Sequence, residues 1–400
     1  MSTRKYPRLQ SLKEITAMMG RYYVKRKALA RLKPLAYVTS GAPVEIMEAM
    51  GILTLYPENY GAICGARGAS VALCQVAEAD GYPPDLCSYA RGHIGASIEP
   101  KSAPLKGMPR PDLLVCCNNI CDTVLKWYEA LADIYDVPLF IIDVPFQRAT
   151  PAEDHIIAYV ADQMREFADW ITTHTGRKLK PAKFRSTLDL AREGIALWQE
   201  ILEFGRHRPS PVNAPDLFIA LAPIVTLRGT RKVIDIYKQL KAELQERVDQ
   251  GVGAVPGERH RLLWDNIAIW TRLYRFFRPF MDAGICFVAD TYTNAWTVEI
   301  DTDEPFVGLA QAYTGVFINV GLPTRMQTIR EMAQRFEADG MVLHANRSCK
   351  PFSITQDEVR TMLRDELGLP AIILEADMCD TRLYNQGAVK ERVAAFIEML

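Results

Sequence analysis

The hydrophobic pattern of the chain switches repeatedly between two periods. Short runs that are almost entirely apolar, such as DLLVCC at 112–117 and VPLFIIDV at 137–144, have the length and composition of strands buried on both faces. Between such runs lie longer segments in which apolar residues recur every three or four positions, as in amphipathic helices. Strands that alternate with helices of this length predict parallel sheets covered by helices, and therefore an α/β fold.

The predicted strands cover residues 35–39, 52–56, 112–117, 137–144, 285–290, 341–345 and 371–376. The predicted helices cover residues 8–32, 44–50, 66–79, 121–136, 325–338, 355–367 and 386–400. Turn residues support these limits; for example, the helix at 66–79 is followed by Gly81, Pro83 and Pro84.

The pattern changes in the middle of the chain. From 151 to 279, long helical segments dominate, among them RKVIDIYKQLKAELQERVDQG, and joints such as RHRPSPVNAPD separate them. The predicted organisation is an N-terminal helix (1–30), a first α/β lobe (31–150), a mainly helical region (151–280) and a second α/β lobe (281–400). The fold class is thus α/β, with two parallel-sheet lobes flanking a helical insert and a functional site in the cleft between the lobes.

Composition and charge exclude several classes of function. The 400 residues include 49% hydrophobic and 24% charged residues, as in an ordinary globular protein, and the formal net charge is −1. No global field therefore attracts nucleic acid or an anionic membrane, and no apolar run is long enough to span a bilayer. The N-terminus lacks the apolar core of a signal peptide, so a cytoplasmic protein is expected. A P-loop and a strand-linked G-x-G-x-x-G are both absent, which disfavours ATP hydrolysis and nicotinamide binding by this chain.

The number and the clustering of the cysteines suggest a chemical role for some of them. In a cytoplasmic chain, nine cysteines are unlike a disulfide framework, and six of the nine lie between Cys64 and Cys121. Cys87, Cys121 and Cys349 stand at predicted strand-to-helix junctions, where an α/β fold places functional groups. From spacing alone, a three-cysteine metal site and inert buried thiols both remain open. The other cysteines are interpreted as core residues; they are Cys64, Cys74, Cys116, Cys117, Cys286 and Cys379.

Several motifs, in order and at compatible spacing, resemble the 2-hydroxyacyl-CoA dehydratase family, which includes the core subunits of benzoyl-CoA reductase and the double-cubane cluster proteins. They are PENYGA, DLCSYARG, LLVCCNNICDTVLKWYE, RHRPSP, HANRSCK and LEADMCD. The resemblance implies a [4Fe–4S] cluster held by Cys87, Cys121 and Cys349. Three thiolates leave one iron open, and that iron acts as a Lewis acid toward a substrate oxygen. Cys117 in place of Cys121 would require a shifted alignment.

The resemblance also assigns catalytic roles to Ser40 and Glu58, which flank the cluster in the related dehydratases and assist removal of the 2-hydroxyl group and a β-proton. Two structural readings compete with these roles. Ser40 precedes the helix at 44–50 and suits a helix N-cap, and Glu58 suits a solvated loop. Trp127 and Tyr128, at helical spacing, are interpreted as core residues.

The implied activity is the elimination of water from an (R)-2-hydroxyacyl-CoA, giving the 2-enoyl-CoA. A single electron from a separate ATP-hydrolysing iron–sulfur activator reaches the thioester carbonyl, acidifies the β-proton and later returns. The implied partners are that activator, an acyl-CoA thioester and a homologous second subunit in a heterodimer.

Three alternatives remain. A benzoyl-CoA reductase-type subunit would use the same scaffold for ring reduction. A double-cubane [8Fe–9S] reductase would need about six thiolates, and an electron-transfer subunit would need a fourth ligand. The sequence leaves open the acyl group and the CoA contacts, for which Arg67, Arg91 and Lys350 are candidates.

Overall fold

The computed structural model describes residues 6–400, so the first five residues of the predicted N-terminal segment lie outside the described part. Two four-stranded sheets, in which every strand pair is parallel, form its framework. The first has the strand order β2-β1-β3-β4 and the second β6-β5-β7-β8. The predicted α/β class with two parallel sheets is confirmed.

The strands of the first sheet are β1 (Leu35–Val38), β2 (Leu53–Leu55), β3 (Leu113–Cys117) and β4 (Leu139–Ile142). The second sheet consists of β5 (His260–Asp265), β6 (Ile285–Asp290), β7 (Gly340–Asn346) and β8 (Ala371–Ala376). The strands β1, β3, β5 and β6 are almost wholly buried, because helices cover both faces of each sheet.

Helices of the first half are α1 (Gln10–Leu29), α2 (Val44–Met50), α3 (Pro57–Ala66), α4 (Ser70–Ala79), α5 (Ser88–Ile98), α6 (Thr123–Tyr135), α7 (Asp154–Thr175) and α8 (Pro181–Glu203). The others are α9 (Ala214–Ala220), α10 (Ala222–Thr226), α11 (Arg231–Asp249), α12 (Leu273–Asp282), α13 (Thr291–Asn294), α14 (Pro305–Thr314), α15 (Leu322–Arg335), α16 (Lys350–Ser353), α17 (Gln356–Leu367) and α18 (Gln386–Met399).

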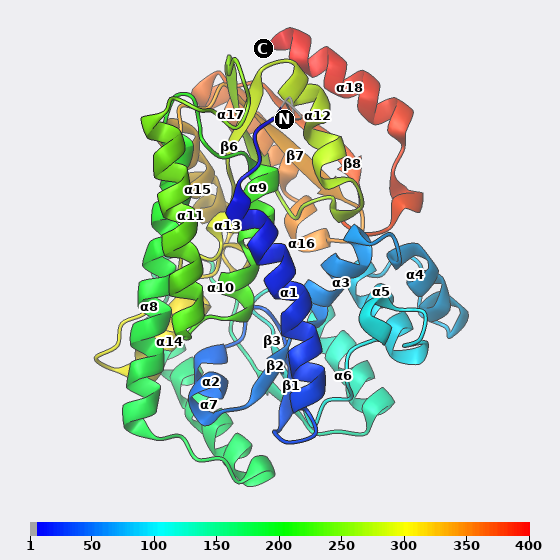
Figure 1. Cartoon of the computed structure of the whole chain (residues 1–400), viewed down its shortest axis with the longest axis vertical. Helices are drawn as coiled ribbons and strands as arrows, with labels where there is room; N and C mark the ends of the chain where they lie inside the picture. Colours follow the sequence, from blue (N-terminus) through cyan, green and yellow to red (C-terminus); the bar gives the residue numbers. More distant parts are fainter. Residues whose placement is uncertain (1–5) are drawn as a thin grey trace.

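Long helices connect the two sheets along one side of the molecule. In Figure 1 the second sheet lies at the top and the first at the bottom, with α8 and α11 running between these levels at the left. α11 packs on α8, and α14 returns from the second half of the chain to pack on α7. α1 crosses in front and packs on α9 and α11. These helices hold the two sheets in one body, in which one end of each sheet faces the other across the middle of the molecule.

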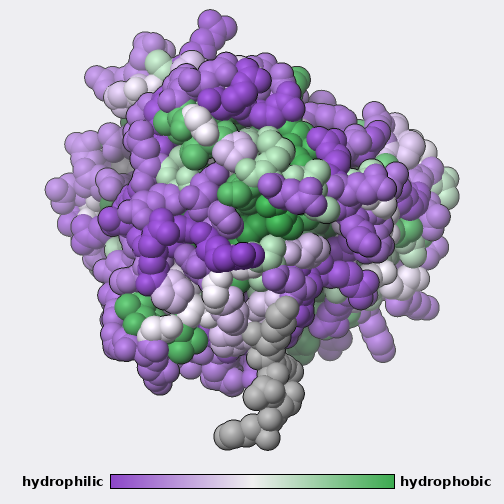
Figure 2. All heavy atoms as spheres, turned by 90° about the horizontal axis from the view of Figure 1, so that it is seen from above, coloured by the Kyte–Doolittle hydropathy of each residue, from purple (hydrophilic) through white to green (hydrophobic). Residues whose placement is uncertain are grey.

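The face of the molecule seen from above is mostly hydrophilic, with hydrophobic side chains gathered near the centre of that view (Figure 2). No helix within residues 6–400 combines the length and the apolar composition that crossing a bilayer requires.

Several local expectations were wrong. The helix predicted at 66–79 starts later, as α4 at Ser70, and the sequence analysis missed α3, which ends at Ala66; Gly68, with a φ of +71°, lies between the two helices. β5 was missed inside the region predicted as helical, although it pairs with both β6 and β7. β4 is an edge strand with a half-exposed face rather than a buried strand. The division into four segments stays a prediction.

Candidate functional site

A cavity of about 140 Å³ lies between the two sheets. Its wall contains Ser40 after β1, Glu58 after β2 and Cys121 after β3. The second sheet contributes residues that follow each of its four strands, including Cys349 after β7 and Met378 after β8. The carboxyl ends of strands from both sheets therefore face one space, which is where parallel α/β proteins bind their ligands. All five residues that the sequence singled out line this cavity; the fifth is Cys87.

Each of the three cavity cysteines stands at the start of a helix. Cys87 and Cys349 are the N-cap residues of α5 and α16, and Cys121 lies two residues before α6. Burial raises the pKa of all three thiols, to about 11 for Cys121 and about 12 for Cys349. Cys87 was expected at a strand-to-helix junction but lies at a joint between two helices, α4 and α5.

Backbone N–H groups at these helix starts oppose the effect of burial. Those of Tyr89 and Ala90 favour the Cys87 thiolate, those of Thr123 and Val124 favour the Cys121 thiolate, and that of Phe352 favours the Cys349 thiolate. The Cys87 thiol also feels both other thiols, which raise its pKa further. The three sulfurs thus share one buried space, and each has amide donors that stabilise negative charge.

A buried polar network fixes the position of Cys87 relative to Cys349. Ser88 donates its backbone N–H to Ser348 Oγ at 3.1 Å, across 260 residues of sequence. Ser348 Oγ in turn donates to Asp377 Oδ2 at 2.5 Å, and Asp377 Oδ1 accepts the backbone N–H groups of Cys379 and Asp380. Because Ser88 and Ser348 are the direct neighbours of Cys87 and Cys349, these bonds hold the two thiols together.

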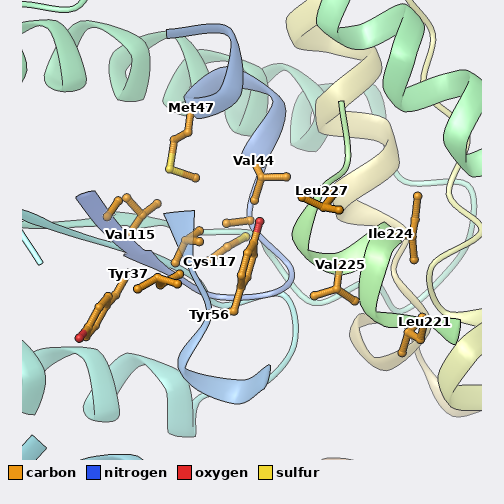
Figure 3. Close-up of a cluster of buried hydrophobic side chains, with 14 of the residues drawn as sticks. Tyr37, Val44, Met47, Tyr56, Val115, Cys117, Leu221, Ile224, Val225 and Leu227 are labelled. Carbon is orange, nitrogen blue, oxygen red and sulfur yellow. The ribbon is translucent and has the colours of Figure 1, made fainter. Parts of the chain in front are cut away.

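The remaining cysteines do not line the cavity. Cys117 is the last residue of β3 and is wholly buried in the hydrophobic cluster of Figure 3, with Val44, Met47 and Tyr56. The interpretation of Cys116 and Cys117 as buried strand residues is consistent with these positions. Three of the other buried cysteines donate a thiol hydrogen bond to a backbone carbonyl group: Cys74 to Ser88, Cys286 to Val212 and Cys379 to Gly61.

Ser40 and Glu58 form a direct contact. The backbone N–H of Ser40 donates to Glu58 Oε1 at 2.8 Å, and Glu58 lies in the first turn of α3. The N-cap of α2 is Pro43, without a side-chain capping bond, so the N-cap interpretation of Ser40 was wrong. The loop interpretation of Glu58 was also wrong, because Glu58 lies in α3 and its buried Oε2 atom has no hydrogen-bond partner among the described residues.

Burial raises the pKa of Glu58 from 4.5 to about 7, although N–H groups of Ser40 and Glu58 and the Ser40 side chain lower it. The carboxyl group therefore exchanges a proton near neutral pH, as an acid or base in catalysis must. Its unpartnered Oε2 atom leaves one acceptor free for a ligand in the cavity.

Replacing Glu58 with glutamine is expected to stabilise the protein at pH 8 but not at pH 4.5. The folded state binds the Glu58 proton more tightly than the unfolded chain, so stability is lost as pH rises from 4.5 to about 7. The loss amounts to at most about 3.5 kcal/mol, because one pKa unit is worth about 1.4 kcal/mol. Urea unfolding at both pH values measures the effect, and exposed Glu391→Gln is the control. An equal stability difference at both pH values would contradict the assignment.

The three thiols fit an iron–sulfur cubane. Among residues 6–400, no three His, Cys, Asp or Glu side chains converge as ligands of a single metal ion. In a cubane each thiolate binds a different iron, so its ligands do not converge on one point. Soft thiolates in a buried cavity with amide donors are the environment in which such clusters are held.

Sequence reasoning missed part of the wall. Arg228 and Tyr313 line the cavity from the α10–α11 joint and from α14. Neither belongs to a motif with a cysteine, and only the packing of α14 onto α7 brings Tyr313 to the site. Trp127 is buried, as expected of a core residue, but it also lines the cavity. Arg91, a candidate for CoA binding, is wholly buried and bonded to Glu78 and Asp380.

Two parallel-sheet α/β halves that place three thiols and a carboxyl group in one shared cavity define the class of α/β proteins whose ligand site lies at the carboxyl ends of the strands. A family model, "2-hydroxyglutaryl-CoA dehydratase, D-component", matches residues 39–400. The chain belongs to this family.

Curated relatives agree with this family. The chain is 33% identical over 390 residues to the alpha subunit of lactoyl-CoA dehydratase of Anaerotignum propionicum, covering 94% of this chain and 92% of that protein. It is 31% identical to the (R)-2-hydroxyisocaproyl-CoA dehydratase alpha subunit of Clostridioides difficile, with the same coverage of each. It is 26% identical to a benzoyl-CoA reductase subunit of Thauera aromatica, covering 89% of this chain and 86% of that protein.

Proposed function

We propose that this chain is the iron–sulfur subunit of an (R)-2-hydroxyacyl-CoA dehydratase, which eliminates water to give the 2-enoyl-CoA. The observation that carries the proposal is that Cys87, Cys121 and Cys349 line one cavity together with the Ser40–Glu58 pair. Dehydratase alpha subunits are also more similar to this chain than the benzoyl-CoA reductase subunit is.

In this proposal, Cys87, Cys121 and Cys349 hold a [4Fe–4S] cluster. The bound cluster supplies an iron without a protein ligand, which attracts the 2-hydroxyl oxygen, and a store for one electron. The amide groups at the starts of α5, α6 and α16 stabilise the charge on the thiolates.

Glu58 is the proposed base. Its Oε2 atom has no hydrogen-bond partner among the described residues and its pKa is about 7, so the protonated carboxyl group donates a proton to the departing hydroxide and the resulting carboxylate then accepts the β-proton. The backbone N–H of Ser40 holds Oε1 and leaves Oε2 for the substrate. We assign the Ser40 side chain to the 2-hydroxyl group, because Ser40 and Glu58 line the same wall.

The proposed partners are a homologous second subunit and a separate ATP-hydrolysing iron–sulfur activator. The relatives are named as subunits, which supports a partner chain. The absence of a P-loop from this sequence is consistent with ATP hydrolysis on another chain.

The alternatives have less support. A double cubane needs about six thiolates, whereas Cys87, Cys121 and Cys349 are the cavity's cysteines within the described residues. An assay distinguishes a ring reductase from a dehydratase. A ring reductase consumes electrons in proportion to the product formed, whereas a dehydratase recovers its single electron after each turnover.

The test is anaerobic purification of the chain with a co-expressed partner, followed by iron and sulfide analysis and an assay with activator and ATP. About four irons assigned to this chain, and enoyl-CoA formed without net electron consumption, are expected. About eight irons would favour the double cubane, and net reduction of an aromatic acyl-CoA would favour the reductase. A folded chain without iron would overturn the proposal.

A further inference from the structure

The charged groups of the cavity restrict what can occupy it. Within the described residues, Glu58 and Arg228 are its only charged lining side chains. A substrate whose acyl chain ends in a second carboxylate would need a free cation in the wall, since an unpaired buried carboxylate is costly. Arg228 is the one side chain of the lining that could provide it.

The guanidinium of Arg228 is already occupied. Its Nε donates to Glu45 Oε1 at 2.8 Å, in an ion pair whose side chains are 2% and 0% exposed. Its Nη1 donates to Ile224 O at 3.4 Å, and its Nη2 donates to the hydroxyl of Tyr313 and, at 3.4 Å, to Ala42 O.

Glu45 is satisfied in the same network. Tyr313 donates its hydroxyl to Glu45 Oε2 at 2.8 Å, so Arg228, Glu45 and Tyr313 form a closed, neutralised triad. The positive charge of Arg228 is thus balanced within the wall, and a ligand carboxylate would have to compete with Glu45 for it.

The other lining residues are mostly hydrocarbon or aromatic. Both halves of the chain contribute them, for example Ile120, Val124 and Trp127 from the first, and Val298, Phe317 and Phe352 from the second. An apolar group gains about 0.8 kcal/mol for each buried CH₂ in such surroundings, whereas a carboxylate loses its hydration. Ionised Glu58 would also repel a second carboxylate.

We infer that the acyl group of the substrate is uncharged and apolar, with a branched aliphatic or aromatic side chain, and is not a dicarboxylic acyl group. This inference rests on the proposed function as far as turnover of the acyl-CoA is concerned. The preference of the cavity for binding an apolar acyl group does not depend on it. The family does not decide the matter, because its model is named for a dicarboxylic substrate whereas the relatives above are named for lactoyl and isocaproyl substrates.

The first experiment compares kcat/KM of the complete system, with partner and activator, for (R)-2-hydroxyisocaproyl-CoA, (R)-phenyllactyl-CoA, lactoyl-CoA and (R)-2-hydroxyglutaryl-CoA. For at least one of the two larger apolar substrates, kcat/KM should be about 100-fold higher than for (R)-2-hydroxyglutaryl-CoA. It should also be about 10-fold higher than for lactoyl-CoA. Equal or faster turnover of 2-hydroxyglutaryl-CoA would overturn the inference.

A binding experiment separates this inference from the proposed function. Calorimetry of the co-purified complex with isocaproyl-CoA and with glutaryl-CoA needs no turnover, and the apolar ester should bind at least about 10-fold more tightly. That preference without dehydration of any substrate would overturn the proposed function alone. Equal binding of the two esters, or tighter binding of glutaryl-CoA, would overturn the inference. If apolar substrates are dehydrated, the proposed function would still stand; if no substrate is dehydrated, the proposed function would be overturned as well.

A variant tests the role of the triad. Glu45→Gln removes the charge that balances Arg228, so the preference for isocaproyl-CoA over glutaryl-CoA should fall about 10-fold. Glu193→Gln, on an exposed pair with Arg231, is the control and should leave it unchanged. An unchanged preference in folded Glu45→Gln contradicts the inference; if that variant does not fold, the wild-type comparisons still decide it.

Discussion

Replacing Cys121 with alanine is expected to abolish cluster binding and to lower dehydratase activity roughly 1000-fold or more, because a Lewis-acid metal contributes several kcal/mol to catalysis. Cys121 is half-buried in the cavity wall, and its removal takes one of three proposed ligands from the cluster. The fold should persist, since the side chain is only partly buried, at the edge of the core. Iron content, the visible absorption of the anaerobic protein and turnover measure the result.

Cys117→Ala is the matched control. Cys117 is four residues away and wholly buried in β3, so its replacement leaves a small core cavity and should cost about 1 kcal/mol of stability. Iron content and activity should be those of the wild type. If Cys117→Ala lost the cluster and Cys121→Ala kept it, the ligand assignment would be wrong, and with it the alignment of the CCNNIC motif.

Replacing Arg228 with methionine is expected to destabilise the protein by about 3–5 kcal/mol at neutral pH, which is the usual cost of leaving one member of a buried ion pair uncompensated. Glu45 would lose its only ion-pair partner within residues 6–400, and Tyr313 and the Ala42 carbonyl would lose a donor. Ala42 follows the Ser40–Gly41 turn, so activity should fall as well. Urea unfolding of the purified chain gives the free energy.

Arg231→Met provides the comparison. Arg231 pairs with Glu193 at 3.6 Å, and the two side chains are 65% and 40% exposed, so its loss should cost less than about 1 kcal/mol. The double variant Arg228→Met, Glu45→Leu should recover part of the stability, because it leaves no unpaired buried charge. Similar costs for Arg228→Met and Arg231→Met would refute the account of the triad.

Much of the fold follows from local pattern. β6 and β8 lie where the apolar runs predict them, and α2 and α6 follow the predicted helical periods closely, because buried strands and amphipathic helices carry their own signal. β5 carries a weaker one. Its strand HRLLWD contains Arg261, which is wholly buried because carbonyl groups of Gly205, His207 and Phe336 and the carboxylate of Glu258 accept its hydrogen bonds. Such compensation comes from distant segments and is invisible in the local sequence.

The motifs also located the proposed site residues. Cys121, Cys349 and Glu58 follow strand ends, and parallel strands present these ends on one edge of a sheet. The sequence could therefore predict which residues meet, although it could not predict their environment. The buried Oε2 atom of Glu58 and its raised pKa depend on how α3 packs against the turn at Ser40.

By itself, then, the sequence determined the two parallel sheets, the family and the five candidate site residues, because each depends on short-range periodicity or on motifs contained in one segment. The tertiary structure alone decided the walls of the cavity. Arg228 and Glu45 are 183 residues apart, and Ser88 and Ser348 are 260 apart, so no local pattern predicts their contact. Whether the charge of Arg228 is free or neutralised depends on the packing of the two sheets and the helices between them, and the proposed preference for an apolar acyl group rests on that packing.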